Sequence, residues 1–75
     1  MTRLPSLRAR EVIAALKRAG FVESHQRGSH LYLHHPERGL LTSVPVHSGR
    51  DLKRGTVRAI LSQAGLTEEA LRALL

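Results

Sequence analysis

Apolar side chains recur along the first quarter of the chain with the spacing of an amphipathic α-helix. They stand at i, i+3, i+4 and i+7, which places them on one face of a helix: Ala9, Val12, Ile13 and Leu16. Ser6 has a side chain that caps helix N-termini, and Gly20 favours the left-handed backbone conformation with which helices end. The pattern therefore predicts a first helix over about residues 7–19.

The apolar period shortens to two in the segment "SHLYLHH", as it does in half-buried β-strands. Leu31 and Leu33 fall on one face of such a strand, and His30, Tyr32 and His34 fall on the other. The leucines are expected to point into the core. The polar face is expected to stay open, where a substrate could reach it.

Two weaker patterns flank this strand. Residues 21–27 are mixed apart from their apolar start, and we interpret them as an edge strand. After a turn at "PERG", residues 40–46 alternate again, and the set predicted to share one face is Leu40, Thr42, Val44 and Val46. Pro45 lacks a backbone N–H, so this strand should lie at an edge or be close to its end there.

Helical spacing returns after a polar, basic connection. Thr56 begins a run that Gly65 ends, and its apolar positions are Val57, Ile60, Leu61 and Ala64. Thr67 is predicted to cap a last short helix whose first turn carries two glutamates. The element order predicts an α+β fold in which a three-stranded antiparallel sheet is covered on one face by two helices.

Length and composition narrow the class of protein. Seventy-five residues predict one domain, residues 1–75, with a small core. The absence of cysteine excludes disulfides and thiolate metal sites. No apolar run approaches the roughly 18 residues of a membrane span, and the N-terminus lacks the apolar stretch of a secretory signal. A cytoplasmic protein without membrane contact is expected.

The charge balance points to nucleic acid. Twelve Lys and Arg against six Asp and Glu give a net charge of +6, and only Lys17 and Lys53 are lysines. Arginine's planar fork suits phosphate oxygens, so a small arginine-rich domain suggests an RNA or DNA partner. Four basic residues gather where the second helix begins, a position that favours phosphate: Arg50, Lys53, Arg54 and Arg58. The alternative is an ordinary solvated basic surface.

The five histidines raise the question of chemistry. Zinc needs three or four ligands converging at about 2.0–2.1 Å, whereas His30 and His34 are roughly 13 Å apart along one strand. No metal or other cofactor is therefore expected. Nucleophilic catalysis lacks a cysteine or a G-x-S-x-G turn. An imidazole, which titrates near about pH 6.5, can still act as a general acid or base on a ribose 2′-hydroxyl or a leaving oxygen. The alternative is that His30 is an ordinary strand residue.

Three segments together resemble the HicA family, small toxins of toxin–antitoxin modules that cleave messenger RNA. The segments are "GSH" at residues 28–30, "VPVH" at residues 44–47 and "GTVRAILSQAGLTEEALRALL" from residue 55 onward. The resemblance begins at about "REVIAALKRAGF". It implies a fold similar to a double-stranded-RNA-binding domain, a messenger-RNA substrate and a HicB-like antitoxin partner.

The resemblance also assigns roles to residues. The histidine of the family's G-S-H-type motif is catalytic, which implies that His30 is the general acid-base of a metal-independent ribonuclease. Gly28 and Ser29 would shape its approach, while His47, in the "VPVH" match, would contact RNA or shape the loop. Arg27 and the basic loop would bind phosphates. The alternatives are a non-catalytic RNA-binding module and, less well supported, a DNA-binding regulator with Arg58 as its base reader.

Overall fold

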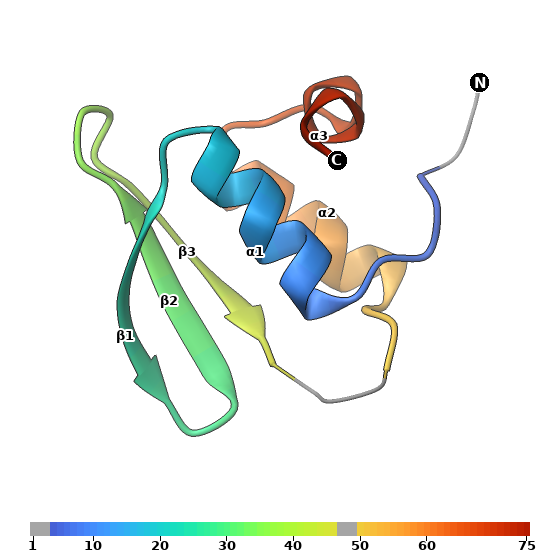
Figure 1. Ribbon diagram of the computed structural model, residues 1–75, viewed down its shortest axis with the longest axis horizontal. Helices are drawn as coiled ribbons and strands as arrows, with labels where there is room; N and C mark the ends of the chain where they lie inside the picture. Colours follow the sequence, from blue (N-terminus) through green and yellow to red (C-terminus); the bar gives the residue numbers. More distant parts are fainter. Residues whose placement is uncertain (1–3, 47–49) are drawn as a thin grey trace.

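The protein folds as one sheet with helices against one of its faces (Figure 1). The computed structural model describes residues 4–46 and 50–75. Its elements are α1 (Ala9–Arg18), β1 (Val22–Arg27), β2 (His30–His35), β3 (Leu40–Pro45), α2 (Arg54–Ala64) and α3 (Glu68–Leu74). The strand order is β1-β2-β3, and both pairs are antiparallel. The predicted α-β-β-β-α arrangement with a short C-terminal helix is confirmed.

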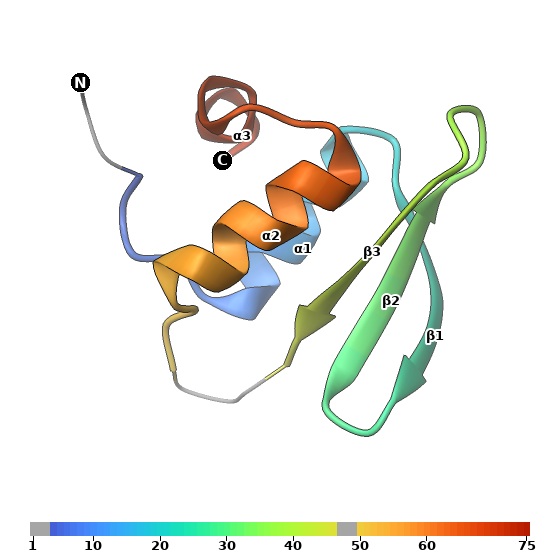
Figure 2. The ribbon, with the colours of Figure 1, turned by 180° about the vertical axis from the view of Figure 1, so that it is seen from behind.

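The helices do not cover the sheet evenly. Figures 1 and 2 show α1 and α2 lying toward β3, with β1 as the strand farthest from them. All six residues of β1 are exposed, which explains its mixed sequence. Its register with β2 shifts between Glu23 and His25, the mark of a bulge. Among the described residues, no helix is both long and apolar enough to cross a membrane.

The first helix begins later than its apolar pattern predicts. It starts at Ala9 with Arg8 as the N-cap, and the Arg8 backbone N–H donates to the Glu11 carboxylate at 2.9 Å. The predicted start at residue 7 and the Ser6 cap are therefore wrong. Leu7 is instead part of an extended segment, because its carbonyl oxygen accepts a hydrogen bond from the Leu52 N–H at 2.7 Å.

The core lies between the helices and the inner face of β2 and β3. Leu31 and Leu33 are buried as predicted, and Leu33 and Val44 are fully inaccessible. Val46 is 37% exposed, so its predicted place on the buried face of β3 is wrong. The reason is that β3 ends at Pro45, and the alternation of a strand does not continue past its end.

The caps predicted for the second and third helices are observed, but the second helix begins earlier than predicted. α2 begins at Arg54 rather than Thr56, because its first turn precedes the first buried residue, Val57. It ends at Gly65, which has a φ of +67°. The Thr67 hydroxyl accepts a hydrogen bond from the Ala70 N–H at 3.0 Å. The predicted N-cap of α3 is thereby confirmed.

A buried histidine connects the end of α1 to the sheet. His35 is 8% exposed, and its ring meets the Phe21 ring edge-on at 5.3 Å between centroids. Its Nδ1 accepts a hydrogen bond from the Arg38 N–H at 3.1 Å. A Cβ at Gly20 would lie 2.7 Å from its Nε2. The imidazole is thus enclosed on several sides, and only glycine fits beside it.

Gly20→Ala is expected to destabilise the protein by at least about 2 kcal/mol. The new Cβ would meet the His35 ring, and Gly20 has a φ of +105°, a region in which side chains are strained. Gly39→Ala is the matched control, because Gly39 also has a positive φ but open space around it; it should cost only about 1 kcal/mol. Urea unfolding followed by circular dichroism measures both, and equal losses would contradict the proposed clash.

Candidate active site and nucleic-acid interface

His30 follows a two-residue turn that fixes its position. Gly28 and Ser29 connect β1 to β2, and Gly28 has a φ of +57°, as the first central residue of a type II′ turn requires. The Gln26 side-chain amide donates to the Gly28 carbonyl oxygen at 3.2 Å. The Ser29 carbonyl oxygen accepts from the Val46 N–H at 2.6 Å. The turn is therefore bonded to β1 and to the residue that follows β3.

The side chain of His30 lies on the open face of the sheet, opposite the buried face of Leu31. It is exposed, and its cross-strand neighbours in register are Arg27 on β1 and Pro45 on β3. Residues paired in this way have Cβ atoms about 4.5–5.5 Å apart. Within the described part of the chain, the guanidinium of Arg27 has no ion-pair or hydrogen-bond partner. An arginine without a partner among the described residues is thus the cross-strand neighbour of His30.

Three of the other histidines lie elsewhere on the sheet. The ring of His25 stacks on that of Tyr32 at 4.7 Å between centroids and 5° between planes. His34 is in a further row, between Val22 and Leu41, and His35 is on the buried side, as its sequence position predicts. Among the residues that the structure describes, no three histidine, aspartate or glutamate side chains form a group that could hold a metal ion.

An open groove runs along the side of β3 that faces α2, and His30 is one of its lining residues. The other lining residues come from β3 and one side of α2: Ser43, Pro45, Gly55, Thr56, Ala59, Ile60 and Gln63. The helix is fastened to the strand at this groove, because the buried Thr42 hydroxyl donates to the Gln63 side-chain oxygen at 2.8 Å. This hydrogen bond therefore links the two walls of the groove.

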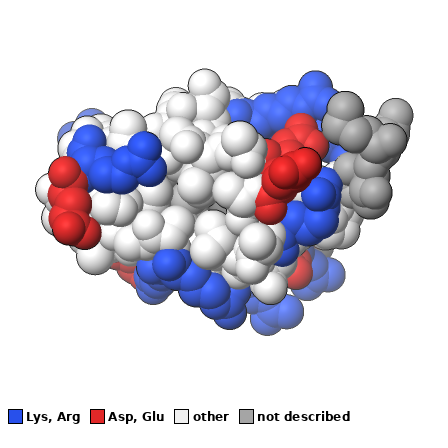
Figure 3. Space-filling model, turned by 90° about the horizontal axis from the view of Figure 1, so that it is seen from above, with Lys and Arg blue, Asp and Glu red and all other residues white. Residues whose placement is uncertain are grey.

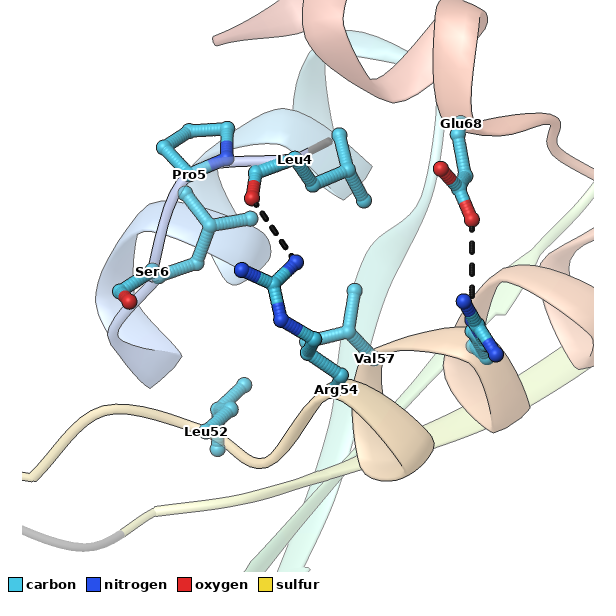
Figure 4. Close-up of a pocket in the computed structure, with 9 residues that line it drawn as sticks. Leu4, Pro5, Ser6, Leu52, Arg54, Val57 and Glu68 are labelled. Atoms are coloured by element: carbon cyan, nitrogen blue, oxygen red, sulfur yellow. Dashed lines mark hydrogen bonds and ion pairs between the residues drawn. The ribbon is translucent and has the colours of Figure 1, made fainter. Parts of the chain in front are cut away.

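The predicted basic cluster is divided by the structure. Arg54 and Arg58 line a different cavity, next to the N-terminal segment. The Arg54 guanidinium donates to the Leu4 carbonyl oxygen at 3.0 Å, and Arg58 pairs with Glu68 at 3.7 Å (Figure 4). Each of these two guanidinium groups thus already has a partner within the protein.

The other two residues of the predicted basic cluster are exposed. Arg50 lies in the loop before α2, and Lys53 is the N-cap of α2. His47 lies outside the described residues. On the face that carries α3, basic side chains form separate groups with uncharged surface between them (Figure 3). The basic side chains on this face thus do not form one continuous patch.

Sequence reasoning missed two features. Leu4 and Leu7 are buried, and their spacing around Pro5 was a signal that the N-terminal segment packs on the core. The groove residues gave no such signal, because Ser43, Thr56 and Gln63 belong to segments whose contact depends on how α2 packs against β3. Hydroxyl and amide side chains at these positions are ordinary for a strand and a helix.

Comparison with known proteins adds a family to this geometry. No curated protein matches the chain. The sequence does match the family described as "HicA toxin of bacterial toxin-antitoxin" over residues 9–66. This range includes α1, the complete sheet and α2, and it covers more than three quarters of the chain. The chain therefore belongs to the HicA family of toxins of bacterial toxin–antitoxin systems.

Proposed function

We propose that this toxin is an endoribonuclease that cleaves messenger RNA with His30 as its general acid-base. The observation that carries the proposal is the pairing of His30 with Arg27 on the open sheet face. An exposed imidazole and an arginine with no partner among the described residues stand in register on adjacent strands. This combination offers a proton acceptor beside a group that binds phosphate.

The proposed reaction needs only groups of the RNA and of this chain. Neutral His30 takes the proton of a ribose 2′-hydroxyl, and that oxygen attacks the adjacent phosphorus. The bond from phosphorus to the 5′-oxygen breaks, and the imidazolium returns the proton to this leaving oxygen. The products are a 2′,3′-cyclic phosphate and a 5′-hydroxyl. Arg27 stabilises the charge that gathers on the phosphate oxygens during the attack.

The other predicted RNA-binding residues have supporting roles in this proposal. Gly28 and Ser29 keep the backbone close to the approaching phosphate, because the turn has no bulky side chain. Arg50 and Lys53 contact the RNA backbone around the start of α2, and His47, which lies outside the described residues, is a further expected RNA contact. Arg54 and Arg58 also have protein partners, so we assign them a smaller share of the RNA affinity.

The alternative function is RNA binding without cleavage. The stacked His25 and Tyr32 rings on the open sheet face favour it, because aromatic side chains on such a face stack on unpaired bases. Catalysis and base stacking are compatible on one surface. The two functions differ only in whether the folded wild-type protein cuts the RNA that it binds.

A toxin of a toxin–antitoxin system has a cognate antitoxin. We propose that this partner is HicB-like and that it blocks the toxin by covering the His30 face or by competing for the basic surface. An acidic surface on the antitoxin would complement the excess of basic residues in this chain.

His30→Ala is expected to lower the rate of RNA cleavage by about 10² to 10⁴, the usual contribution of acid-base catalysis. The fold should persist, because His30 is exposed and its truncation leaves no core cavity. His34→Ala, on the same face of β2 but in another row, should keep wild-type activity. Cleavage of a labelled RNA is measured, with circular dichroism as the folding control. Unchanged cleavage by His30→Ala would exclude the assignment.

The two arginines Arg27 and Arg54 are expected to differ in effect. Arg27→Ala should lower kcat/KM for RNA by about tenfold or more at unchanged stability, because its side chain meets the phosphate and has no partner in the described residues. Arg54→Ala should mainly lower the free energy of unfolding, by about 1 kcal/mol, through loss of the bond to Leu4. Kinetics and urea titration of both variants test this. The prediction would be refuted if Arg27→Ala lowered the free energy of unfolding and Arg54→Ala mainly lowered kcat/KM.

Cleavage is expected to continue in excess EDTA, because the proposed steps use an imidazole and a guanidinium and no metal-bound water. The measurement compares initial rates of the purified protein with and without chelator, before and after addition of Mg²⁺ or Zn²⁺. Loss of activity in EDTA that one of these ions restores would replace the histidine mechanism with a metal-dependent one.

A further inference from the structure

The groove between β3 and α2 has the properties of a nucleotide subsite. We propose that it binds the nucleotide next to the phosphate on which His30 acts, as single-stranded RNA, and that Ser43 and Thr56 select this nucleotide. The proposal rests on the function proposed above and adds to it the location of the strand and the residues that read it.

Continuity with His30 is the first argument. His30 itself lines the groove, and Pro45, its partner in register on β3, lines it too. Ser43 is two residues away on the same face of β3, opposite Tyr32. A strand whose phosphate lies at His30 can therefore extend into the groove without leaving the protein surface.

The chemistry of the lining is the second argument. Ser43 and Thr56 carry hydroxyls that both donate and accept hydrogen bonds, as the edges of bases and the ribose 2′-hydroxyl require. Gln63 accepts from Thr42 through its oxygen, so its amide nitrogen is the end directed to further acceptors. The half-buried Pro45 adds apolar surface, the buried Ile60 forms part of the floor, and no carboxylate lines the groove. A negatively charged nucleotide thus meets no like charge among these residues.

The dimensions of the groove are the third argument. Its volume is about 380 Å³, within the range of small-molecule sites and far too small for a duplex. The lining residues of α2 run from Gly55 to Gln63, a distance of about 12 Å along the helix axis. Gly55 has no atom within 4 Å of where a Cβ would be, so this wall of the groove is open to a ligand.

Ala59→Glu tests occupancy of the groove, with Ser62→Glu as the matched control. Both positions are exposed on α2 and both variants change the net charge equally, but only Ala59 lines the groove. Ala59→Glu is expected to weaken binding of a single-stranded oligonucleotide and to lower its cleavage by at least about tenfold, because the carboxylate repels phosphate. Ser62→Glu should stay within about twofold of the wild type. Thermal unfolding confirms that both variants are folded.

Thr56→Val tests selection of the nucleotide and also decides the matter if Ala59→Glu does not fold. It removes the hydroxyl at nearly constant shape, so the ratio of cleavage between preferred and poor sites in an RNA pool should change by about threefold to tenfold. If the wild type cleaves RNA but Ala59→Glu equals Ser62→Glu, or Thr56→Val keeps the wild-type site preference, the subsite is wrong while His30 catalysis stands. If the folded wild type cleaves no RNA, the proposed function and the subsite both fail.

Discussion

The burial of one face of the sheet under α1 and α2 is the interaction on which the rest of the structure depends. A chain of 75 residues has a small core, and here that core lies against one face of the sheet. Leu33 and Val44 on the sheet and Val12 and Leu16 on α1 are fully buried. The opposite face, with His30, His34 and Tyr32, is left to solvent as a direct consequence. The candidate site exists because the core is one-sided.

Hydrogen bonds at the edges of this core hold the residues around the open face in defined positions. The Ser29 carbonyl is bonded to Val46, which fixes the turn before His30 against the end of β3. The bond from Thr42 to Gln63 joins the other side of β3 to α2. The two hydrogen bonds thus hold the turn before His30 and the helix α2 in place relative to β3. A catalytic imidazole gains from such fixed surroundings, since small displacements of reacting groups lower rates strongly.

Some basic residues are paired within the protein and others are not, and the net charge of the chain does not distinguish the two groups. Arg8, Lys17 and Arg58 pair with Asp51, Glu23 and Glu68, and Arg54 binds the N-terminal segment. Exposed ion pairs of this kind contribute little stability individually, yet they reduce the positive charge available to a phosphate. Arg27, in register with His30, and Arg50 and Lys53, just before α2, are exposed, and their side chains have no ion-pair or hydrogen-bond partner among the described residues. A count of basic residues therefore overstates the positive charge that a phosphate group could meet.

The sequence by itself determined the order of the elements, the buried face of β2 and the caps at Gly65 and Thr67. These depend on periodicity and on local backbone preferences, which adjacent residues set. Three segments together also indicated the family, and one of them, "GSH", indicated the histidine to test. Only the tertiary structure decided that Arg54 and Arg58 line a different cavity, that Leu4 and Leu7 are buried in the core, and that Ser43 and Thr56 line one groove with His30. Such contacts join segments distant in the chain, and the angle at which α2 packs on β3 fixes them, which no local pattern encodes.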